Sequence, residues 1–479
     1  MGMTGTTAGD AVGFRRPLAL LVAGAYFMEI LDGTIIAPAA PAIAADLGVA
    51  PVDVNIVLSA YLLTLAVLIP TGGHLSDRFG ARRVFTTALV VFTLASLGCA
   101  LASSLPMLTA TRVLQGVGGA LMVPVGRLVV LRGIEKTDLV RAIAYLTWPA
   151  LLAPVLAPAV GGLLSTYIGW QWIFLINLPL GVAGVLVARR VVPDVRADTP
   201  PRFDTVGFLL LAGGLAALVV AIERVGTAQE LWSVGGGALL GAVLLTLAVR
   251  HLVRTPRPLI DLRILRIGTF RTSATAGTVY RLVVSAVPFL LPLLFQIGFG
   301  WTAAQAGAVV IALFVGNVAI KPATTPLMRL LGIRGVLLLA ALGGSACLVG
   351  MVWVRADTPL LVLLPLLVAS GVFRSIGFTG FNSVTFADVG PADLGSANTL
   401  NATLQEVASG AGIALGALLV RLGGPVAERL GFDPEPGTPY RVTFVVMATV
   451  LLATAAAVLR MPRSAGRAVT GHRRPRDEE

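Results

Sequence analysis

The chain has 479 residues, of which 56% are hydrophobic and 13% are charged. A soluble protein carries charge on about a quarter of its residues, so this composition excludes a soluble protein and indicates one that lies in a bilayer. The net charge of +12 is spread between apolar segments, which argues against the continuous basic patch of a nucleic-acid-binding protein.

Fourteen apolar runs follow one another along the chain, and each can cross about 30 Å of hydrocarbon as a helix. We place them at residues 17–42, 54–73, 84–103, 107–131, 141–164, 172–190, 205–223, 233–253, 272–298, 303–324, 335–354, 359–379, 398–420 and 441–461. We therefore predict an all-α polytopic membrane protein with two six-helix lobes and two extra linking helices. The predicted domains are a tail (1–16), a first lobe (17–192), linkers with two additional helices (193–271), a second lobe (272–461) and a second tail (462–479).

Arginines gather in alternate loops, and the loops between them carry little positive charge. These alternate loops are expected to be cytoplasmic. Both tails also carry arginine. We therefore expect a multi-pass protein of the cell (inner) membrane with both termini in the cytoplasm, which requires an even number of spans. In the linker 254–270, arginines alternate with residues such as Ile260 and Ile264, and this pattern predicts a segment lying in the membrane interface.

The first span carries two acids, Glu29 and Asp32, three residues apart and therefore on one face of the helix. An ionised group at mid-membrane costs about 2.5 to 3.5 kcal/mol on insertion scales, so each acid needs a reason to be there. Burial favours the neutral form of a carboxyl group, whereas a nearby arginine favours its charged form. A change of partner can therefore make the carboxyl group bind or release a proton. Asp32 is the first candidate for proton coupling. The alternative is a structural acid held by a permanent partner.

The second and third spans are joined by a short charged hairpin, GHLSDRFGARR. Its glycines permit a tight turn and a close approach of the helices. Asp77 is expected to cap a neighbouring helix N-terminus, while Arg82 and Arg83 hold the loop on the cytoplasmic side. The residues of this predicted gating loop are Gly73, Asp77, Arg78, Gly80, Arg82 and Arg83.

A degraded copy of this hairpin, TPLMRLLGIRGVL, follows the tenth span. The alignment pairs Gly80 with Gly332, Arg82 with Arg334, and Asp77 with Arg329. Two lobes related by such a repeat, around a central cavity, are expected of many secondary transporters. Accidental similarity between apolar sequences is the alternative.

The fourth span contains Arg112, the expected partner of Asp32, because both lie in the predicted outer half of the bilayer. Its glycines are interpreted as a packing face, since a nucleotide loop is excluded at that depth. The fifth span contains three prolines and the motif residues Pro158, Gly161 and Gly162. It is interpreted as a hinge, as a seal against a facing helix, or as a merely bent helix.

Four charged residues of the second lobe lie roughly five to nine residues from a predicted cytoplasmic helix end and so share one layer. They are Arg281, Lys321, Arg374 and Glu406. We interpret the three basic ones as substrate-cavity or switch charges, with snorkelling toward the interface as the alternative. Glu406 is either a second proton site or a salt-bridge partner that changes with conformation.

Motifs that are absent from the sequence limit the possible energy sources for transport. Neither Lys136 nor Lys321 follows a glycine, so no P-loop is present, and the three histidines show no metal-binding spacing. We therefore expect no cofactor, no metal site and no enzyme activity, and transport driven by a gradient or by a partner's ATPase.

Together these segments resemble the major facilitator superfamily, specifically its fourteen-helix drug:proton antiporter branch of bacterial multidrug efflux proteins. FMEILDGTIIAPAAPAIA resembles the first-helix acidic motif of the branch, GHLSDRFGARR the loop motif, TRVLQGVGGA the fourth-helix arginine motif, and WQWIFLINLPLG another typical stretch. The resemblance implies that Asp77 and its arginines gate the cytoplasmic side and that Asp32 with Arg112 handles the proton. It also implies that Pro158, Gly161 and Gly162 belong to the antiporter motif.

The chain departs from the family pattern at three places. Ala153 and Ala157 replace glycines of the fifth-span motif, and a usual glutamine pair reads Gln405 then Glu406. Because of these departures, the resemblance alone does not determine whether protons and substrate move in opposite directions or in the same direction.

We therefore expect proton-coupled export of lipophilic small molecules by alternating access, from a chain that functions as a monomer, binds protons and small-molecule substrate, and does not bind nucleic acid. The intramembrane charges favour neutral, zwitterionic or anionic cargo. They are three acids (Glu29, Asp32, Glu406) and four bases (Arg112, Arg281, Lys321, Arg374). Alternatives are a dedicated exporter or importer of one metabolite or natural product and, more remotely, a membrane receptor or scaffold that does not transport.

Overall fold

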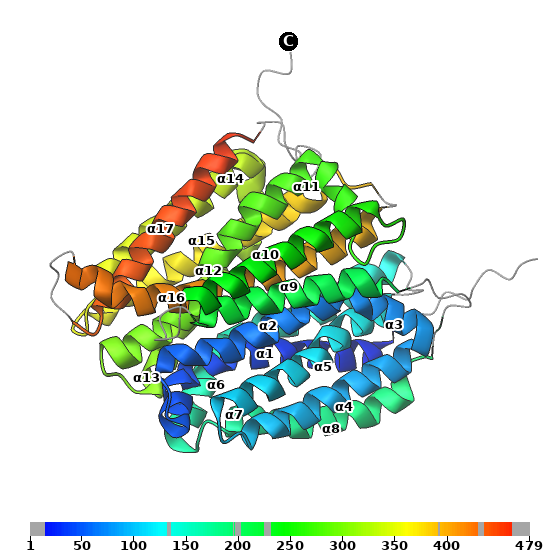
Figure 1. The fold of residues 1–479 in the computed structure, drawn as a ribbon, viewed down its shortest axis with the longest axis horizontal. Helices are drawn as coiled ribbons and strands as arrows, with labels where there is room; N and C mark the ends of the chain where they lie inside the picture. Colours follow the sequence, from blue (N-terminus) through cyan, green and yellow to red (C-terminus); the bar gives the residue numbers. More distant parts are fainter. Residues whose placement is uncertain are drawn as a thin grey trace, which may run out of the picture.

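The computed structural model describes residues 15–131, 136–194, 196, 203–224, 231–390, 393–429 and 435–461. Its regular structure is helical, as the apolar runs predict. The two predicted tails lie outside the described residues, apart from Arg15 and Arg16. The helices run roughly alongside one another in one bundle, with the N-terminal helices on one side and the C-terminal helices on the other (Figure 1).

The first lobe is built from six long helical segments. They are α1 (Arg16–Leu47), α2 (Asn55–Leu68) with its continuation α3 (Gly72–Phe79), α4 (Ala81–Ala100), α5 (Leu105–Leu131), α6 (Lys136–Tyr167) and α8 (Asn177–Val191), with the short α7 (Trp172–Leu175) before α8. Helix α1 packs along α6, and α5 lies against both α2 and α4. The glycines of α5 allow this, because a Cβ at Gly118 would lie 2.7 Å from the carbonyl oxygen of Ala88 on α4. The glycine-rich stretch is therefore a packing face, as predicted.

The second lobe repeats this plan. It consists of α11 (Gly268–Thr272) and α12 (Thr278–Leu293), joined by a π-helical turn, followed by α13 (Ala303–Ala319), α14 (Lys321–Val352), α15 (Leu360–Phe386), α16 (Leu394–Arg429) and α17 (Thr438–Leu459). Helix α14 is broken at Gly332, where φ is 66°. Gly80, between α3 and α4, has φ of 89°. The two glycines aligned by the repeat thus both occupy the left-handed region, which glycine tolerates best.

Two further helices, α9 (Thr205–Arg224) and α10 (Leu231–Arg254), form a hairpin between the lobes. Helix α9 contacts both α2 and α16, so the hairpin lies along the line where the two lobes meet (Figure 1). In the following linker, Ile260 and Ile264 are buried against Leu400 of α16. These two side chains therefore pack against protein, and the position of the linker in the membrane interface stays a prediction.

Twelve helices of the described chain are long and apolar enough to cross a membrane. Within the described residues, α13 and the segment Leu151–Tyr167 of α6 are apolar but shorter. The structure therefore supports a multi-pass helical membrane protein. Fourteen spans are predicted from the sequence, and the described residues contain twelve helices that meet the length and hydropathy of a span.

We call the end of the bundle that holds Gly80 and Gly332 the basic end, and the other the opposite end. One apolar core is shared by both lobes, and the first lobe joins it in its opposite half. There Ile35 and Ile36 belong to the same cluster as Leu290 of α12 and Phe295 of the π-helical turn that follows α12. In the basic half, the core of the first lobe forms a cluster of its own around Phe85 and Phe92. The two lobes are therefore packed together most continuously at the opposite end.

Asp204 anchors the hairpin of α9 and α10 at the basic end. Its Oδ1 accepts the backbone N–H of Gly207 at 2.9 Å and lies 2.8 Å from Nε2 of His251, while Oδ2 accepts the N–H of Leu259 at 3.1 Å. Burial alone would raise the pKa of Asp204, but the hydrogen bonds outweigh burial and lower the pKa below its ordinary value. Asp204 is therefore an N-cap that also ties α10 and the linker to α9.

Candidate functional site

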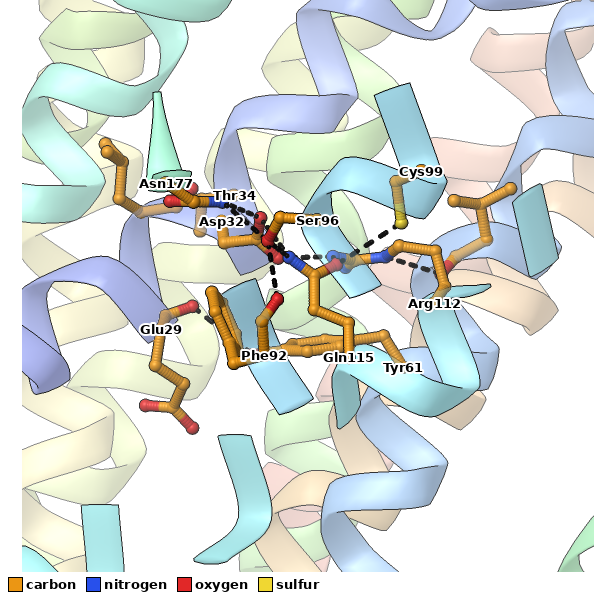
Figure 2. Close-up of polar contacts among 12 residues, drawn as sticks. Glu29, Asp32, Thr34, Tyr61, Phe92, Ser96, Cys99, Arg112, Gln115 and Asn177 are labelled. Atoms are coloured by element: carbon orange, nitrogen blue, oxygen red, sulfur yellow. Dashed lines mark hydrogen bonds and ion pairs between the residues drawn. The ribbon is translucent and has the colours of Figure 1, made fainter. Parts of the chain in front are cut away.

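Asp32 and Arg112 form a buried ion pair, as predicted from their depth in the first and fourth spans (Figure 2). Their residues are 1% and 0% exposed. The Nη1 group of Arg112 donates to Oδ2 of Asp32. A buried charge without a partner is very costly, and here each side chain is the partner that the other needs.

Two amide side chains complete the hydrogen bonding of Asp32 (Figure 2). Nε2 of Gln115 and Nδ2 of Asn177 donate to Oδ1 at 2.8 Å and 2.7 Å. Gln115 also donates to Oγ of Ser96 at 2.8 Å and accepts from Nη1 of Arg112 at 2.6 Å. The Asp32 carboxylate thus receives hydrogen bonds from three side chains, so both of its oxygen atoms have partners.

Arg112 is fixed in place by its surroundings. Its Nε donates to the carbonyl oxygen of Val57 at 3.3 Å, and its guanidinium carbon lies 4.0 Å from the centroid of the Tyr61 ring. The ring stabilises the cation through a cation–π contact. The pair therefore bridges α1 and α5 and also touches α2.

Sequence reasoning missed Gln115, Asn177 and Ser96 as members of this network. Gln115 lies inside the motif-like stretch TRVLQGVGGA and Asn177 inside WQWIFLINLPLG. Their position in these stretches is the sequence feature that could have identified them as functional residues. A polar amide in an apolar span needs a buried partner, but nothing in the sequence says which one.

Glu29 lies one helical turn from Asp32, and its carboxylate points away from the network (Figure 2). It forms no ion pair in the part of the chain that the structure describes. The Coulombic field of Glu406, on α16 of the second lobe, acts on Glu29. The two predicted acids thus lie within Coulombic range of each other, on different lobes.

The predicted layer of charges in the second lobe divides into two groups. The guanidinium groups of Arg281 and Arg374 lie 4.4 Å and 5.2 Å from the centroid of the Phe378 ring. Nζ of Lys321 instead donates to Oγ1 of Thr379 at 3.2 Å. The structure therefore brings Arg281 and Arg374 together around an aromatic ring that sequence reasoning did not identify, and gives Lys321 a separate partner.

The loop motif makes one contact that was not predicted. Nε of Arg82 donates to the carbonyl oxygen of Val192 at 2.5 Å, which ties the hairpin to the end of α8. Asp77 accepts no hydrogen bond from a helix N-terminus among the described residues, so the predicted cap is absent from this conformation. A Cβ at Gly73 would meet nothing within 4 Å, so Gly73 does not mediate close packing. Arg78 and Arg83 are exposed.

The glycines of the fifth-span motif lie in contacts that leave no room for a Cβ atom. A Cβ at Gly162 would lie 3.2 Å from the Cα of Ala304 on α13, and one at Gly161 would lie 3.0 Å from Pro38 of α1. A Cβ at Gly307 of α13 would in turn collide with the carbonyl oxygen of Pro158. Of the three interpretations of this span, a seal against a facing helix agrees best with these contacts.

Four polar contacts between the lobes lie in the opposite half of the bundle. They are the ion pair of Arg421 with Asp53 at 2.7 Å, and hydrogen bonds from Gln296 to Pro38 at 2.9 Å, from Ala304 to Thr166 at 3.1 Å and from Ser59 to Gly410 at 3.2 Å. These contacts, the seal of α6 on α13 and the shared apolar core close the opposite end in this conformation.

Comparisons with known proteins agree with this architecture. The family model described as Major Facilitator Superfamily matches residues 22–413 and 273–477. A protein of Escherichia coli O6:H1 described as "Putative multidrug resistance protein MdtD" is 35% identical over 465 residues, which cover 96% of this chain and 97% of that protein.

Two solved structures show the same fold. The structure of an auto-inhibited POT family peptide transporter aligns with a TM-score of 0.67 at 14% identity and covers 94% of this chain and 98% of that one. The nucleoside transporter NupG aligns with a TM-score of 0.60 at 13% identity and covers 93% and 98%. At such identities the likeness concerns the fold alone.

Proposed function

Because this chain belongs to the Major Facilitator Superfamily, we propose that it exports lipophilic small molecules in exchange for protons. The relatives and structural neighbours described above are transporters, not enzymes. Similarity to a multidrug resistance protein along 96% of the chain favours several drug-like cargoes over a single metabolite. The proposed driving force is the proton gradient across the cell membrane, without a cofactor.

We propose fourteen crossings, with the basic end in the cytoplasm. Helix α6 has 32 residues, a length of about 48 Å at 1.5 Å per residue. Helix α13 is continued by the first part of α14 as far as the turn at Gly332. Both would therefore cross the hydrocarbon. The arginines around the Gly80 and Gly332 turns favour a cytoplasmic basic end through the positive-inside rule.

Transport would proceed by alternating access of the two lobes. The sealed opposite end then faces outward, and this conformation is the one that receives cargo from the cytoplasm. Export requires the seal between α6 and α13 to open while the basic end closes.

The observation that carries the proton-coupling proposal is the contrast between Asp32 and Glu29. Asp32 is held by an ion pair with Arg112 and by hydrogen bonds from two amides. Glu29 forms no ion pair with any residue that the structure describes, and it lies within Coulombic range of Glu406. Two carboxylates within Coulombic range repel when both are ionised, so protonation of one relieves the repulsion. We propose that Glu29 and Glu406 take up protons in this conformation. Asp32 would follow only when Arg112 moves away.

The test is substrate-induced proton release from proteoliposomes, read with a pH-sensitive dye. Norfloxacin and deoxycholate serve as zwitterionic and anionic cargo. We expect Glu29→Gln and Asp32→Asn each to abolish proton release, and the exposed-acid variant Asp357→Asn to retain it. Intact pH-driven export in Glu29→Gln, Asp32→Asn and Glu406→Gln alike would overturn the proposal.

The proposed cargo is neutral, zwitterionic or anionic. Within the described membrane segments the basic side chains Arg281, Arg374 and Lys321 form no ion pair, so a permanently cationic molecule would add to an unneutralised positive charge. A resistance panel in an expressing strain checks this. Selective resistance to quaternary ammonium compounds alone would contradict it.

A further inference from the structure

The second lobe contains a cavity with about 330 Å³ of empty space, part of it open to the surroundings. Its lining includes Arg281, Phe378, Asn382 and Gln405, with Nε2 of Gln405 donating to Oδ1 of Asn382 at 2.8 Å. Ser273, near the basic end of the lobe, also lines it. The cavity therefore lies in the half of the lobe that we assign to the cytoplasmic side.

Two arginines lie against one aromatic ring at this cavity. Arg281 and Arg374 both make cation–π contacts with Phe378, and Arg374 also lies 5.6 Å from the Phe314 centroid. Nε and Nη1 of Arg374 are buried and have no hydrogen-bond partner among the residues that the structure describes. Neither arginine forms an ion pair with any residue that the structure describes. Both guanidinium groups therefore retain unused capacity to bind an acceptor.

This arrangement concentrates positive charge in a place where charge is costly. The two guanidinium groups are within Coulombic range of each other and repel. Glu406 is the acid whose field reaches Arg281, but it forms no ion pair with it. Cation–π contacts compensate part of the cost of burying a cation, but they do not neutralise its charge. An anion bound beside Arg281 would do so.

We propose that Arg281, supported by Arg374, is a binding subsite for the carboxylate of an amphipathic organic anion whose apolar part rests on the Phe378 ring. The guanidinium fork of Arg281, which lines the cavity, would donate two parallel hydrogen bonds to the carboxylate. Arg374, which contacts the same ring, adds positive potential. This inference rests on the proposed transport function, because it names the class of cargo that the cavity receives.

The experiment compares two probes that differ only in charge, dansylglycine and its neutral amide, dansylglycinamide. Binding to the purified full-length protein in detergent is followed by the rise in dansyl fluorescence. We expect the wild type to bind the acid at least about tenfold more tightly than the amide. Arg281→Gln should reduce this ratio to below about twofold, and Arg374→Gln should reduce it to an intermediate value.

Arg257→Gln is the matched control, because Arg257 is exposed in the linker at the basic end and lies outside the cavity. It should leave the ratio unchanged. A variant that binds dansylglycinamide as tightly as the wild type does is folded. In the wild type, competition between benzoate and dansylglycine tests the subsite without any substitution. Equal binding of acid and amide by the wild type, an unchanged ratio in Arg281→Gln, or no saturable binding of the acid up to about 1 mM would each overturn the proposal.

The detergent assay contains no proton gradient, so its outcome is independent of proton coupling. Loss of proton release in proteoliposomes with acid selectivity intact would refute antiport and leave the anion subsite standing. Normal proton release without acid selectivity would refute the subsite alone.

Discussion

Arg334 makes in the second lobe the contact that Arg82 makes in the first. Arg82 donates to the carbonyl oxygen of Val192 at the end of α8, and Arg334 donates to the carbonyl oxygen of Leu459 at the end of α17, at 2.6 Å. Each arginine comes two residues after the glycine that forms the turn, and each satisfies a carbonyl at the C-terminus of the last helix of its lobe. The shared contact supports a structural repeat over accidental similarity.

The turn glycines should not tolerate a side chain. Gly80→Ala is expected to lower the free energy of unfolding by at least about 1 kcal/mol, because φ is 89° and a Cβ would enter the space of Asp194 and Arg196. The measurement is the thermal unfolding midpoint in detergent, read with a thiol-reactive dye, since Cys99 and Cys347 are buried and free. Gly73→Ala is the control and should unfold as the wild type does. Equal midpoints for the two variants would contradict this explanation.

Breaking the buried pair should separate its structural from its functional role. Asp32→Asn leaves Arg112 as an uncompensated buried charge, so we expect a loss of about 3 to 5 kcal/mol in stability. The double variant Asp32→Asn, Arg112→Gln removes both charges and should recover most of this loss, but not proton-coupled transport. Thermal unfolding and proteoliposome flux are measured on all three proteins. Recovery of coupled transport by the double variant would assign Asp32 a structural role only.

The seal at the opposite end should fail when a side chain is added inside it. Gly162→Val is expected to force α6 away from α13 and to expose the seam between the lobes. The readout is the labelling rate of a cysteine introduced by Ser59→Cys with a membrane-impermeant thiol reagent applied from the outside. Gly24→Val is the control, because a Cβ at Gly24 meets nothing within 4 Å. Labelling that is no faster with Gly162→Val than with the control would argue against the seal.

Asp204 should contribute a pH-dependent part of the stability. Its pKa is lowered in the folded protein, so its contribution is fully present above the unfolded pKa of about 3.9 and is lost as pH falls through the lower folded value. We expect Asp204→Asn to unfold at a lower temperature than the wild type at pH 7, and the difference to shrink below about pH 4. Asp388→Asn is the control, since Asp388 forms no hydrogen bond among the described residues. A difference that is the same at pH 7 and pH 3 would refute this assignment.

Much of the architecture could be predicted because its causes are local. Hydrocarbon thickness sets the length of each apolar run, and a repeated glycine-arginine spacing marks both interhelical turns. Even the pairing of Asp32 with Arg112 follows from depth alone, because two opposite charges at one level of a bundle have few other partners. The cap by Asp77 failed because a local motif does not say which helix end lies nearby.

The sequence by itself determined a helical membrane protein, the positions of its apolar runs and its candidate charged residues, since these depend on residues close together in the chain. Only the tertiary structure decided that Gln115 and Asn177 hold Asp32 in place and that Arg281 and Arg374 share Phe378. It alone shows that the opposite end is closed, partly by contacts such as that between Ser59 and Gly410, 351 positions apart. Such contacts depend on how whole helices pack, and helices of similar apolar composition can pack in many ways until side-chain shape and buried hydrogen bonds select one.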